Sequence, residues 1–445
     1  MSSHFHTSKV TPQLSITLPP SKSLYNRLFV MARLAHRPIP LLWHQLDLCE
    51  DLAVMLHASG SSEERISVGA SGTAMRLLTA LFALTTEREV LLVSPVRRMT
   101  ERPLAQLIAL LSQLGANLTQ PASQEPVEGL YPLVRIRPMS LQQEGLPTLI
   151  LPSGLESSQT VTALLLIAPY LPHGLALRWQ DDQLPSASYI QLTCSLMQTC
   201  GIELAVDRHG IYVAPGAYCE ATLTRLLSHP IGDWSSAQYP LQWALMAPRP
   251  CKILLTNVPA QSLQPDARAL ELLQISPEWL SAGDNTLCFD SELLQKHLRE
   301  LTFGSLSLSN NPDFAPTLIA LLLYYQKKAQ LRGLDLLRLK ESDRIALILR
   351  NGEQLGYQLA YETESGFCLA GSAPSSVHTP IPIATDADHR MVMAWAPFAW
   401  YHQLQIETPQ AVDKSYPTFW RDLRKLCEVI ETPLYMSTNP LHYDL

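Results

Sequence analysis

Six apolar segments, each opened by a short polar cluster, recur along the chain. Apolar runs of this length predict buried helices, and the polar residues before them are typical of helix starts. The segments follow one another at intervals of about 50 to 85 residues, which indicates a repeat. They span residues 21–35, 71–84, 157–171, 233–247, 310–325 and 388–400.

A second pattern lies between these segments: an amphipathic helix, a small residue and then a strand. Examples are "LIALLSQLGANL", "LTCSLMQTCGIELAV" and "LILRNGEQLGYQLAY". Gly115, Gly201 and Gly356 stand where a glycine is expected to end a helix. Each unit is therefore predicted to hold strands and two helices, one buried and one half-exposed. Six such units of about 75 residues predict an α/β repeat protein.

Composition supports a globular protein and limits its partners. The chain has 445 residues, 47% of them hydrophobic and 16% charged, and its net charge is -7. This length suits two or three domains with large cores. Neither an acidic nor a basic tail stands out, so we expect no nucleic acid and no membrane surface as partner. Any anionic ligand must be held by local positive charge.

Targeting and redox signals point to the cytoplasm. The first twenty residues lack the apolar stretch of a signal peptide, and the longest apolar runs are too short to span a bilayer. Eight cysteines are scattered without a C-x-x-C pair. They are therefore expected to be free thiols, mostly in the core, and neither zinc nor a disulfide framework is indicated.

The helix starts suggest a ligand. The first N–H groups of a helix lack helical partners and carry about half a positive charge, which attracts anions. Ser, Thr and Asp are also ordinary caps, so capping alone explains the polar clusters. Capping does not explain first-turn cations, which the dipole disfavours; these are Lys22, Arg27, Arg76, His389 and Arg390. A bound phosphate or carboxylate would offset the mismatch.

One stretch, "LRLKESDRIALILRNGEQLG", concentrates charge before an apolar helix. Lys340 and Arg344 are spaced to share a helix face, and Glu341 stands three residues before Arg344. The stretch is either a salt-bridged exposed turn or an acid–base carboxylate held among cations. Arg102, in another stretch, precedes a proline that suits the first position of a helix.

Three further stretches leave two interpretations each. Asp313 stands between prolines before an apolar helix, as a cap or as a general base. Asp386, Asp388 and His389 form a D-x-D-H string without the distant partner that a metal site needs. Lys414 precedes an aromatic helix and is either a surface lysine or a ligand for an anion. The motifs of nucleotide, dinucleotide and acyl-serine sites are missing.

Ten phrases, in this order, resemble 5-enolpyruvylshikimate-3-phosphate synthases. They are "SKSLYNR", "SGTAMRLLTA", "RRMTERPL", "SSQTVTALLL", "SASYI", "DWSSAQY", "NPDFAPTL", "LKESDR", "DHRMVMA" and "KSYPTFW". The resemblance runs from about Pro19 to Leu426. It implies a two-domain inverse α/β barrel with three repeated units per domain and an active site in the cleft between the domains. Residues 20–232 would form one domain, and residues 1–19 with 233–445 the other.

The resemblance also implies a reaction. The enolpyruvyl group of phosphoenolpyruvate passes to the 5-hydroxyl of shikimate 3-phosphate, and phosphate leaves through a tetrahedral intermediate. These two substrates are the expected partners, the protein is expected to be a cytoplasmic monomer, and no metal or organic cofactor is implied. Both substrates carry a phosphate and a carboxylate, which agrees with cationic helix starts in an acidic chain.

Matching positions imply the site residues. Those at phosphoenolpyruvate are Lys22, Gly72, Arg102, Arg344, Arg390 and Lys414. Those at shikimate 3-phosphate are Ser23 and Arg27 for the carboxylate, Ser157, Ser158 and Ser186 for the phosphate, Gln159 for the ring, and Asp313 and Lys340 for the hydroxyls. The implied catalytic residues are Asp313 as the base, Glu341 as the proton relay and Lys22 as its rival.

Four positions depart from the family pattern. Ala70 and Leu336 stand where asparagine is usual, and Leu77 and Ser188 where proline is common. These departures do not affect the implied acid, the implied base or the five cations implied at phosphoenolpyruvate.

Two other functions remain open at this point. A sister transferase acting on a UDP-amino sugar usually carries a reactive cysteine, and residues 50–193 hold none. A non-catalytic sensor of phosphate ligands would tolerate loss of Asp313 or Glu341, and both are present.

Overall fold

The computed structural model of the chain describes residues 11–122, 125–139, 145–180, 187–280, 282–283, 285–362, 366–369 and 380–437. Ser186, one of the implied phosphate ligands, lies outside these residues.

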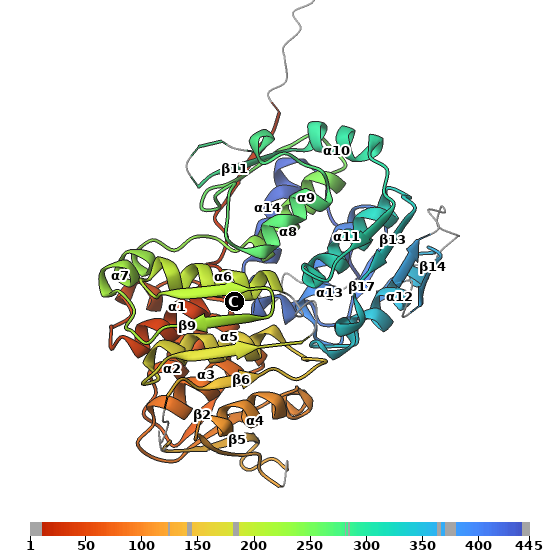
Figure 1. Ribbon diagram of the computed structural model, residues 1–445. Coiled ribbons are helices and arrows are strands. Elements are labelled where there is room, and N and C mark those ends of the chain that lie inside the picture. Colours follow the sequence, from red (N-terminus) through yellow and green to blue (C-terminus); the bar gives the residue numbers. More distant parts are fainter. Residues whose placement is uncertain are drawn as a thin grey trace, which may run out of the picture.

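Two lobes, each with its own hydrophobic core, make up the molecule (Figure 1). The core of the N-terminal lobe is built from residues 24–227. The core of the C-terminal lobe combines residues 14–18 with residues 234–430. The chain therefore begins in one lobe, builds the other and then returns.

Three four-stranded sheets repeat one topology. In each, the first two strands are parallel and flank a buried helix, and a second helix leads to an antiparallel hairpin. The strands are β2 (Arg65–Ser67), β3 (Val90–Ser94), β4 (Asn117–Thr119) and β5 (Tyr131–Arg137); β6 (Thr148–Ile150), β7 (Leu175–Arg178), β8 (Leu204–Asp207) and β9 (Gly210–Val213); and β12 (Ser305–Ser307), β13 (Ala329–Arg332), β14 (Leu359–Glu362) and β15 (Gly366–Leu369).

The other three units keep the buried helix but have fewer strands. One pairs β1 (Gln13–Ile16) with β10 (Lys252–Leu255), which also pairs with β11 (Leu287–Asp290). Another is the parallel pair of β16 (Ile381–Ile383) and β17 (Leu404–Ile406). Residues 21–60, all of them described, form helices and no strand. The six-unit α/β prediction is thus confirmed, with three complete and three reduced units.

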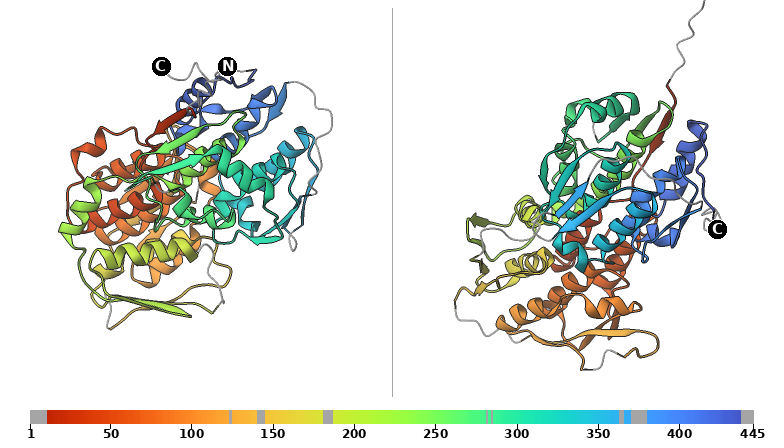
Figure 2. Two further views of the ribbon diagram at one scale, coloured as in Figure 1. Left: turned by 90° about the horizontal axis from the view of Figure 1, so that it is seen from above. Right: turned by 90° about the vertical axis from the view of Figure 1, so that its right-hand side faces the viewer.

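All six predicted buried helices are present. They are α1 (Lys22–Leu34), α3 (Gly72–Thr85), α5 (Ser158–Ile167), α8 (Trp234–Met246), α11 (Ala315–Tyr324) and α13 (His389–Trp395). Helices α1, α3 and α5 pack on one another in the N-terminal lobe, and α11 packs on α8 and α13 in the C-terminal lobe (Figure 2). Such mutual burial explains why these runs carry few charges.

The predicted half-exposed helices are α4 (Ala105–Gln113), α6 (Ala187–Thr199) and α12 (Arg344–Gln354). Gly115, Gly201 and Gly356 follow them with φ of 94°, 88° and 81°, in the left-handed region that glycine adopts freely. The other helices are α2 (Glu50–Gly60), α7 (Glu220–Ser228), α9 (Ala269–Leu272), α10 (Ser291–Glu300) and α14 (Phe419–Val429).

Short 3₁₀ helices connect many of these elements. They are η1 (Leu41–His44), η2 (Arg97–Glu101), η3 (Ala168–Tyr170), η4 (Pro265–Arg268), η5 (Pro277–Trp279), η6 (Pro312–Phe314), η7 (Asp335–Leu339), η8 (Ala396–Trp400) and η9 (Pro409–Lys414).

Two adjacent segments join the lobes. Pro20 and Gly232 form an isolated antiparallel bridge. On either side of it, the Ser21 N–H donates to the Ile231 carbonyl at 3.0 Å, and the Asp233 N–H donates to the Pro19 carbonyl at 3.0 Å. The two crossings are therefore joined by hydrogen bonds into one element between the lobes.

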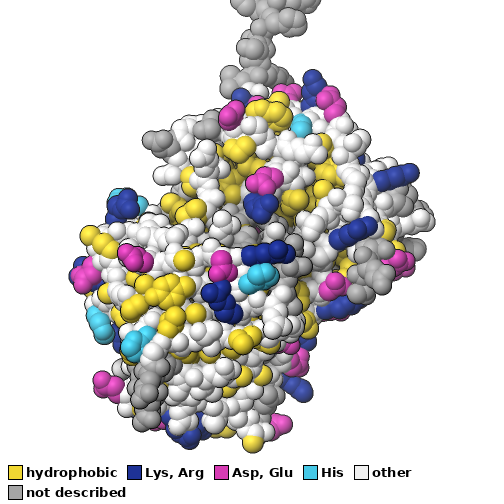
Figure 3. Space-filling model, in the orientation of Figure 1, with side chains coloured by type: hydrophobic (Ala, Val, Ile, Leu, Met, Phe, Trp, Pro, Cys, Tyr) yellow, Lys and Arg dark blue, Asp and Glu magenta, His cyan; other side chains and the backbone are white. Residues whose placement is uncertain are grey.

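The helices, cysteines and surface charges can be compared with what the composition indicated. Within the described part of the chain, every helix is too short or too polar to cross a membrane. The eight cysteines are free thiols, and five of them are buried. Figure 3 shows charged side chains of both signs dispersed over one face of the molecule, without a large patch of a single sign.

Candidate active site

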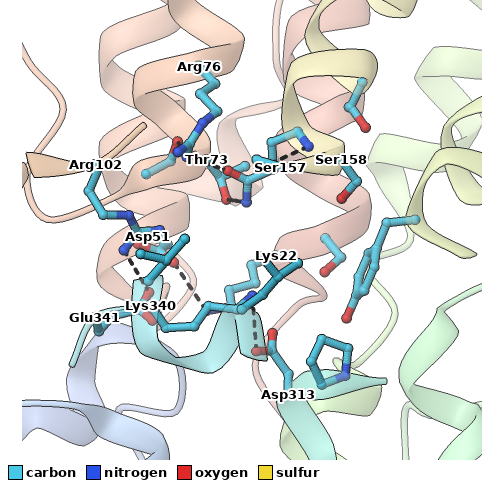
Figure 4. Close-up of a pocket in the computed structure, with 18 of the residues that line it drawn as sticks. Lys22, Asp51, Thr73, Arg76, Arg102, Ser157, Ser158, Asp313, Lys340 and Glu341 are labelled. Atoms are coloured by element: carbon cyan, nitrogen blue, oxygen red, sulfur yellow. Dashed lines mark hydrogen bonds and ion pairs between the residues drawn. The ribbon is translucent and has the colours of Figure 1, made fainter. Parts of the chain in front are cut away.

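A polar cleft lies between the lobes and is lined from both sides. The implied ligand residues that the structure describes line this cleft, except Lys414, which contacts Glu341 from beside it. The implied residues that line it are Lys22, Ser23, Arg27, Gly72, Arg102, Ser157, Ser158 and Gln159 from the N-terminal lobe and Asp313, Lys340, Glu341, Arg344 and Arg390 from the C-terminal lobe; several of them are labelled in Figure 4.

Side-chain caps order four of the six helix starts. Ser21, Ser71, Ser157 and Asp388 accept backbone N–H groups of the first turns of α1, α3, α5 and α13. The capping interpretation is correct at these positions. The cations of the same turns still lie in the cleft, so capping and a positive cleft coexist.

Arg27 is a buried cation held by neutral groups. Its side chain is 4% exposed, its Nε donates to Thr193 Oγ1 at 2.8 Å, and its Nη2 donates to the Tyr189 carbonyl at 3.2 Å. Burial lowers the pKa of Arg27 to about 10. A carboxylate bound in the cleft beside it would relieve that cost of burial.

Gln159 is oriented by two residues of α3. Its Oε1 accepts from Arg76 Nη1 at 2.8 Å, and its Nε2 donates to Thr73 Oγ1 at 2.8 Å. Burial lowers the pKa of Arg76 to about 9, and the nearby Arg102 adds to this effect. Arg76 therefore serves to fix the amide of Gln159 in place.

Lys22 contacts a carboxylate that the sequence did not single out. Its Nζ lies 3.1 Å from Asp51 Oδ2, on α2. Burial favours the neutral amine, but anionic neighbours led by Asp51 raise the pKa of Lys22 above its usual value. Lys22 is thus a permanent cation in this state of the cleft.

Three carboxylates surround Arg344, which is 1% exposed. Its guanidinium contacts Asp313 Oδ1 at 2.9 Å, Glu341 Oε2 at 2.8 Å and Asp388 Oδ2 at 2.7 Å. Asp388 also caps α13 and accepts from Ser342 Oγ at 3.0 Å. Asp388 therefore fixes the arginine, and its role is structural support of the site.

Asp313 lies among three cations. Arg390 Nη2 contacts its Oδ2 at 3.0 Å, and Arg344 and Lys340 approach its Oδ1 at 2.9 and 3.5 Å. Burial alone would raise the pKa of Asp313, but Arg390, Lys340 and Arg344 hold it well below its usual range. The carboxylate is therefore ionised in this state of the cleft, as a general base must be.

Glu341 occupies the point where cations of both lobes converge. Lys414 Nζ lies 3.2 Å and Arg102 Nη1 3.6 Å from its Oε1, and Arg344 Nη2 lies 2.8 Å from its Oε2. Burial opposes its charge, yet Lys414, Arg344 and Arg102 hold the pKa of Glu341 well below its usual value. An anionic ligand would compete with Glu341 for the same three cations.

His389 adds a neutral ring beside these charges. It is 1% exposed, and neither ring nitrogen has a hydrogen-bond partner within the described residues. Burial lowers the pKa of His389 well below its usual value, and the nearby cations Lys22 and Arg390 lower it further. The imidazole is therefore uncharged in this state of the cleft.

Two local predictions were wrong, and two alternatives that the sequence left open are excluded. Pro103 does not open α4, which begins at Ala105, so Arg102 reaches the cleft from a loop. Lys340 and Arg344 share no helix face, because Lys340 is extended and α12 begins at Arg344; they meet through Asp313 instead. Lys414 is 8% exposed, which excludes a surface lysine. The salt-bridged turn is likewise buried rather than exposed at Arg344.

Four supporting residues escaped the sequence analysis. Asp51 and Asp266 stood in no quoted phrase, Tyr189 stood in "SASYI" without an assigned role, and Asp388 was considered only as a weak metal ligand although it opens "DHRMVMA". Among the described residues, no group of three or more His, Cys, Asp and Glu side chains has the geometry of a metal site. The signal that could have found Asp51 and Asp388 is their position in the first turn or at the cap of a helix that faces the cleft.

Comparison with known proteins places this geometry in a family. The model of the family EPSP synthase (3-phosphoshikimate 1-carboxyvinyltransferase) matches residues 48–423. A 3-phosphoshikimate 1-carboxyvinyltransferase of Bacteroides fragilis is 34% identical over 420 residues, covering 92% of this chain and 94% of that protein. One from Escherichia coli is 29% identical over 451 residues, covering 93% and 96%.

Solved structures share the fold. EPSP synthase from Acinetobacter baumannii superposes with a TM-score of 0.61 at 17% identity, covering 93% of this chain and 96% of that one. The enolpyruvyl transferase NikO from Streptomyces tendae gives 0.57 at 14% identity, covering 96% of both chains. The predicted two-domain enolpyruvyl transferase fold is thereby confirmed.

Proposed function

The chain belongs to the EPSP synthase (3-phosphoshikimate 1-carboxyvinyltransferase) family, and from this premise we propose how its cleft performs the reaction. The enzyme transfers the enolpyruvyl group of phosphoenolpyruvate to shikimate 3-phosphate and releases phosphate, in the synthesis of chorismate and aromatic amino acids. One observation carries the assignment of roles: cations from both lobes converge on Glu341 and Asp313 in a single cleft.

Phosphoenolpyruvate binds at the cations around Glu341. Its phosphate and carboxylate are held by Lys22, Arg102, Arg344, Arg390 and Lys414. The distances of 2.8 to 3.6 Å from three of these cations to Glu341 support this assignment, because they mark the volume that an anion can occupy. The backbone of Gly72 lies next to this volume, since a β-carbon there would come within 2.7 Å of Arg102.

Shikimate 3-phosphate binds along α1 and α5. Ser23 and Arg27 hold its carboxylate, and burial of Arg27 without a described carboxylate partner supports that role. Ser157 and Ser158 hold its phosphate at the start of α5, where unpaired N–H groups favour an anion, and Ser186 completes this set. Gln159 lies against the ring. Lys340 and Asp313 contact the hydroxyls from the other lobe.

Proton transfer uses two carboxylates. Glu341 donates a proton to the methylene of phosphoenolpyruvate, which makes the adjacent carbon electrophilic. The 5-hydroxyl attacks that carbon and gives its proton to Asp313. The tetrahedral intermediate then breaks its bond to phosphate, which leaves with the proton from Asp313, while the methyl group returns a proton to Glu341. Each carboxylate ends as it began, and the hydroxyl proton leaves on the phosphate.

Substrate binding prepares Glu341 for this role. In the cleft described above, Lys414, Arg344 and Arg102 keep the Glu341 pKa too low for a proton donor. Phosphoenolpyruvate pairs its own phosphate and carboxylate with these cations. With less positive charge left to stabilise the carboxylate, burial raises the Glu341 pKa. Lys22 stays charged beside Asp51 and stabilises the developing negative charge, so Glu341 is the better candidate for the donor.

Three further assignments complete the proposal. The protein acts as a monomer, because one chain supplies both sides of the cleft. It works in the cytoplasm, without nucleic acid or membrane partners. Residues 20–232 form one domain, and residues 1–19 with 233–445 form the other. The two separate cores and the paired crossings at Pro20 and Gly232 support this division.

Phosphate release tests the function. The purified enzyme is incubated with both substrates and with each one omitted, and inorganic phosphate is measured over time. We expect release only when both substrates are present. Equal release from phosphoenolpyruvate alone would indicate a phosphatase, and silence at high enzyme concentration would indicate a sensor that binds these anions without turnover.

A further inference from the structure

A buried carboxylate outside the cleft lining links the two lobes. Asp266 lies in η4 of the C-terminal lobe and is 5% exposed. Its Oδ2 accepts from the phenol of Tyr189 at 2.9 Å, and its Oδ1 accepts from Ser235 Oγ at 2.6 Å. Tyr189 belongs to α6 of the N-terminal lobe and lines the cleft. One carboxylate therefore ties a cleft residue of one lobe to the first turn of α8 in the other.

The contacts continue from Ser235 to the reacting centre. Ser235 Oγ accepts from Arg390 Nη2 at 3.1 Å, and the same Nη2 lies 3.0 Å from Asp313 Oδ2. Arg390 is 3% exposed, so few other positions are open to its guanidinium. Three hydrogen bonds thus connect Asp266 with Asp313, the proposed base.

On its other side, Tyr189 is tied to the proposed shikimate site. Its carbonyl accepts from Arg27 Nη2 at 3.2 Å and from Thr193 Oγ1 at 2.9 Å. Burial, with a further contribution from Asp266, raises the pKa of Tyr189 well above its usual value. The phenol therefore stays protonated and donates to Asp266 Oδ2. Arginine can only donate, so Ser235 accepts from Arg390 and gives its own proton to Asp266 Oδ1.

We propose that Asp266 is a positioning residue that couples the two halves of the active site: it holds Tyr189 from across the cleft and, through Ser235 and Arg390, sets the orientation of Asp313. The proposal rests on the function proposed above. Binding at Arg27 and proton transfer at Asp313 then depend on one buried carboxylate that contacts neither substrate. Both oxygens of Asp266 accept hydrogen bonds, whereas an amide in its place would offer only one acceptor.

A double-mutant cycle tests the coupling. Tyr189→Phe removes one hydroxyl, and Asp266→Asn changes one oxygen to an amide. Each single variant is expected to lower kcat about tenfold, the loss typical of one hydrogen bond to a buried charged group. The double variant should be no slower than the slower single variant, because both changes break the same chain of contacts. Ser235→Ala should lower kcat while leaving the KM for shikimate 3-phosphate within about twofold.

The chain offers a matched control. Asp422, 4% exposed, accepts from Tyr416 Oη at 3.1 Å and from Thr418 Oγ1 at 2.6 Å within the C-terminal lobe, and none of the three residues lines the cleft. Tyr416→Phe and Asp422→Asn should lower the melting temperature as much as the test pair but leave kcat and both KM values unchanged. This control separates a loss of positioning from a loss of stability.

Three results would overturn the coupling. One is a Tyr189→Phe variant that folds and keeps the parent kcat, and it decides the matter even if Asp266→Asn fails to fold. Another is additive loss in the double variant, and a third is an equal kcat loss in the Asp422 control. Each requires an active parent enzyme, so failure of the coupling is distinguishable from failure of the proposed function, which would show as an inactive parent.

Discussion

Arg102 and Glu341 face each other across the cleft from different lobes, with Arg102 Nη1 3.6 Å from Glu341 Oε1. This ion pair spans the cleft, and its anion is a carboxylate of the protein itself. Lys414 and Arg344 contact the same carboxylate, so one glutamate neutralises three cations that also suit a phosphate. If phosphoenolpyruvate binds as proposed, its binding is an exchange of one anion for another at these cations.

Glu341→Gln should separate binding from chemistry. The neutral amide no longer competes for the cations, so the affinity for phosphoenolpyruvate should rise about tenfold, equivalent to ~1.4 kcal/mol. Turnover should fall about 10²–10⁴-fold, because the proton relay is lost. Calorimetry and steady-state kinetics measure the two effects. Glu101→Gln, which breaks only the exposed pair with Arg98, should change neither. Weaker binding together with full turnover would contradict the exchange.

Gly72→Ala should weaken phosphoenolpyruvate binding. A β-carbon at residue 72 would lie 2.7 Å from Arg102 Nη2 and 3.1 Å from Arg76 Nη1, so both guanidinium groups must shift. We expect the KM for phosphoenolpyruvate to rise about tenfold with a smaller change in kcat. Gly60→Ala is the control, because a β-carbon there meets nothing within 4 Å. An unchanged KM in Gly72→Ala would mean that Arg102 does not hold this substrate.

Asp51→Asn should shift the alkaline side of the pH–rate profile. Burial and Arg390 lower the pKa of Lys22, and Asp51 is the main group that raises it. Removing that carboxylate leaves the lowering effects, so Lys22 should lose its proton at lower pH and activity should fall earlier as pH rises. The measurement is kcat/KM between pH 6 and about pH 10. Asp47→Asn, at an exposed position before α2, should keep the parent profile. A profile identical to the parent in Asp51→Asn would remove Asp51 from the site.

Asp233 should make stability depend on pH. Burial, with help from Asp266, raises the pKa of this 1%-exposed carboxyl to about 6, against a usual value of 3.8. The folded state then binds the proton more tightly than the unfolded state. Its stabilising contribution is complete below about pH 4 and is lost as pH rises through about 6.

The matching variant is Asp233→Asn, which cannot titrate. It should flatten the curve of unfolding free energy between about pH 4 and pH 6, where the parent should lose up to about 3 kcal/mol from this group. Urea denaturation at several pH values gives both curves. If the parent became more stable across this interval and the variant kept the same slope, Asp233 would not be the titrating group.

The helices and the repeat units could be predicted from the sequence because the interactions that form them are local. Apolar runs, caps such as Ser71, and glycines such as Gly201 act within one or two turns. Pairs between segments that are distant in the sequence have no such local cause. Asp388 and Arg344 are 44 residues apart, and Tyr189 and Asp266 are 77 apart. Their meeting depends on how the units pack, which periodicity does not encode.

The ligand residues were predicted from the resemblance to a family, whereas the helices were predicted from local patterns. Phrases such as "LKESDR" identified Glu341 and Arg344 by resemblance, whereas the charge pattern alone also allowed an exposed turn. Lys414 shows that neighbouring residues do not predict burial. A lysine before an aromatic helix is usually exposed, but this one is only 8% exposed. Its burial is compensated by Glu341, 73 residues earlier in the chain.

The most direct test of the central claim is the reaction run in D₂O with both substrates, followed by mass spectrometry of the product methylene group. If the cleft protonates phosphoenolpyruvate, adds the 5-hydroxyl and then eliminates phosphate, solvent deuterium must enter the methylene through the transient methyl group. The account predicts deuterium in the enolpyruvyl product, none in phosphoenolpyruvate incubated without shikimate 3-phosphate, and a loss of both product and label in Asp313→Asn. Product formed without deuterium, or label entering phosphoenolpyruvate in the absence of the second substrate, would contradict it.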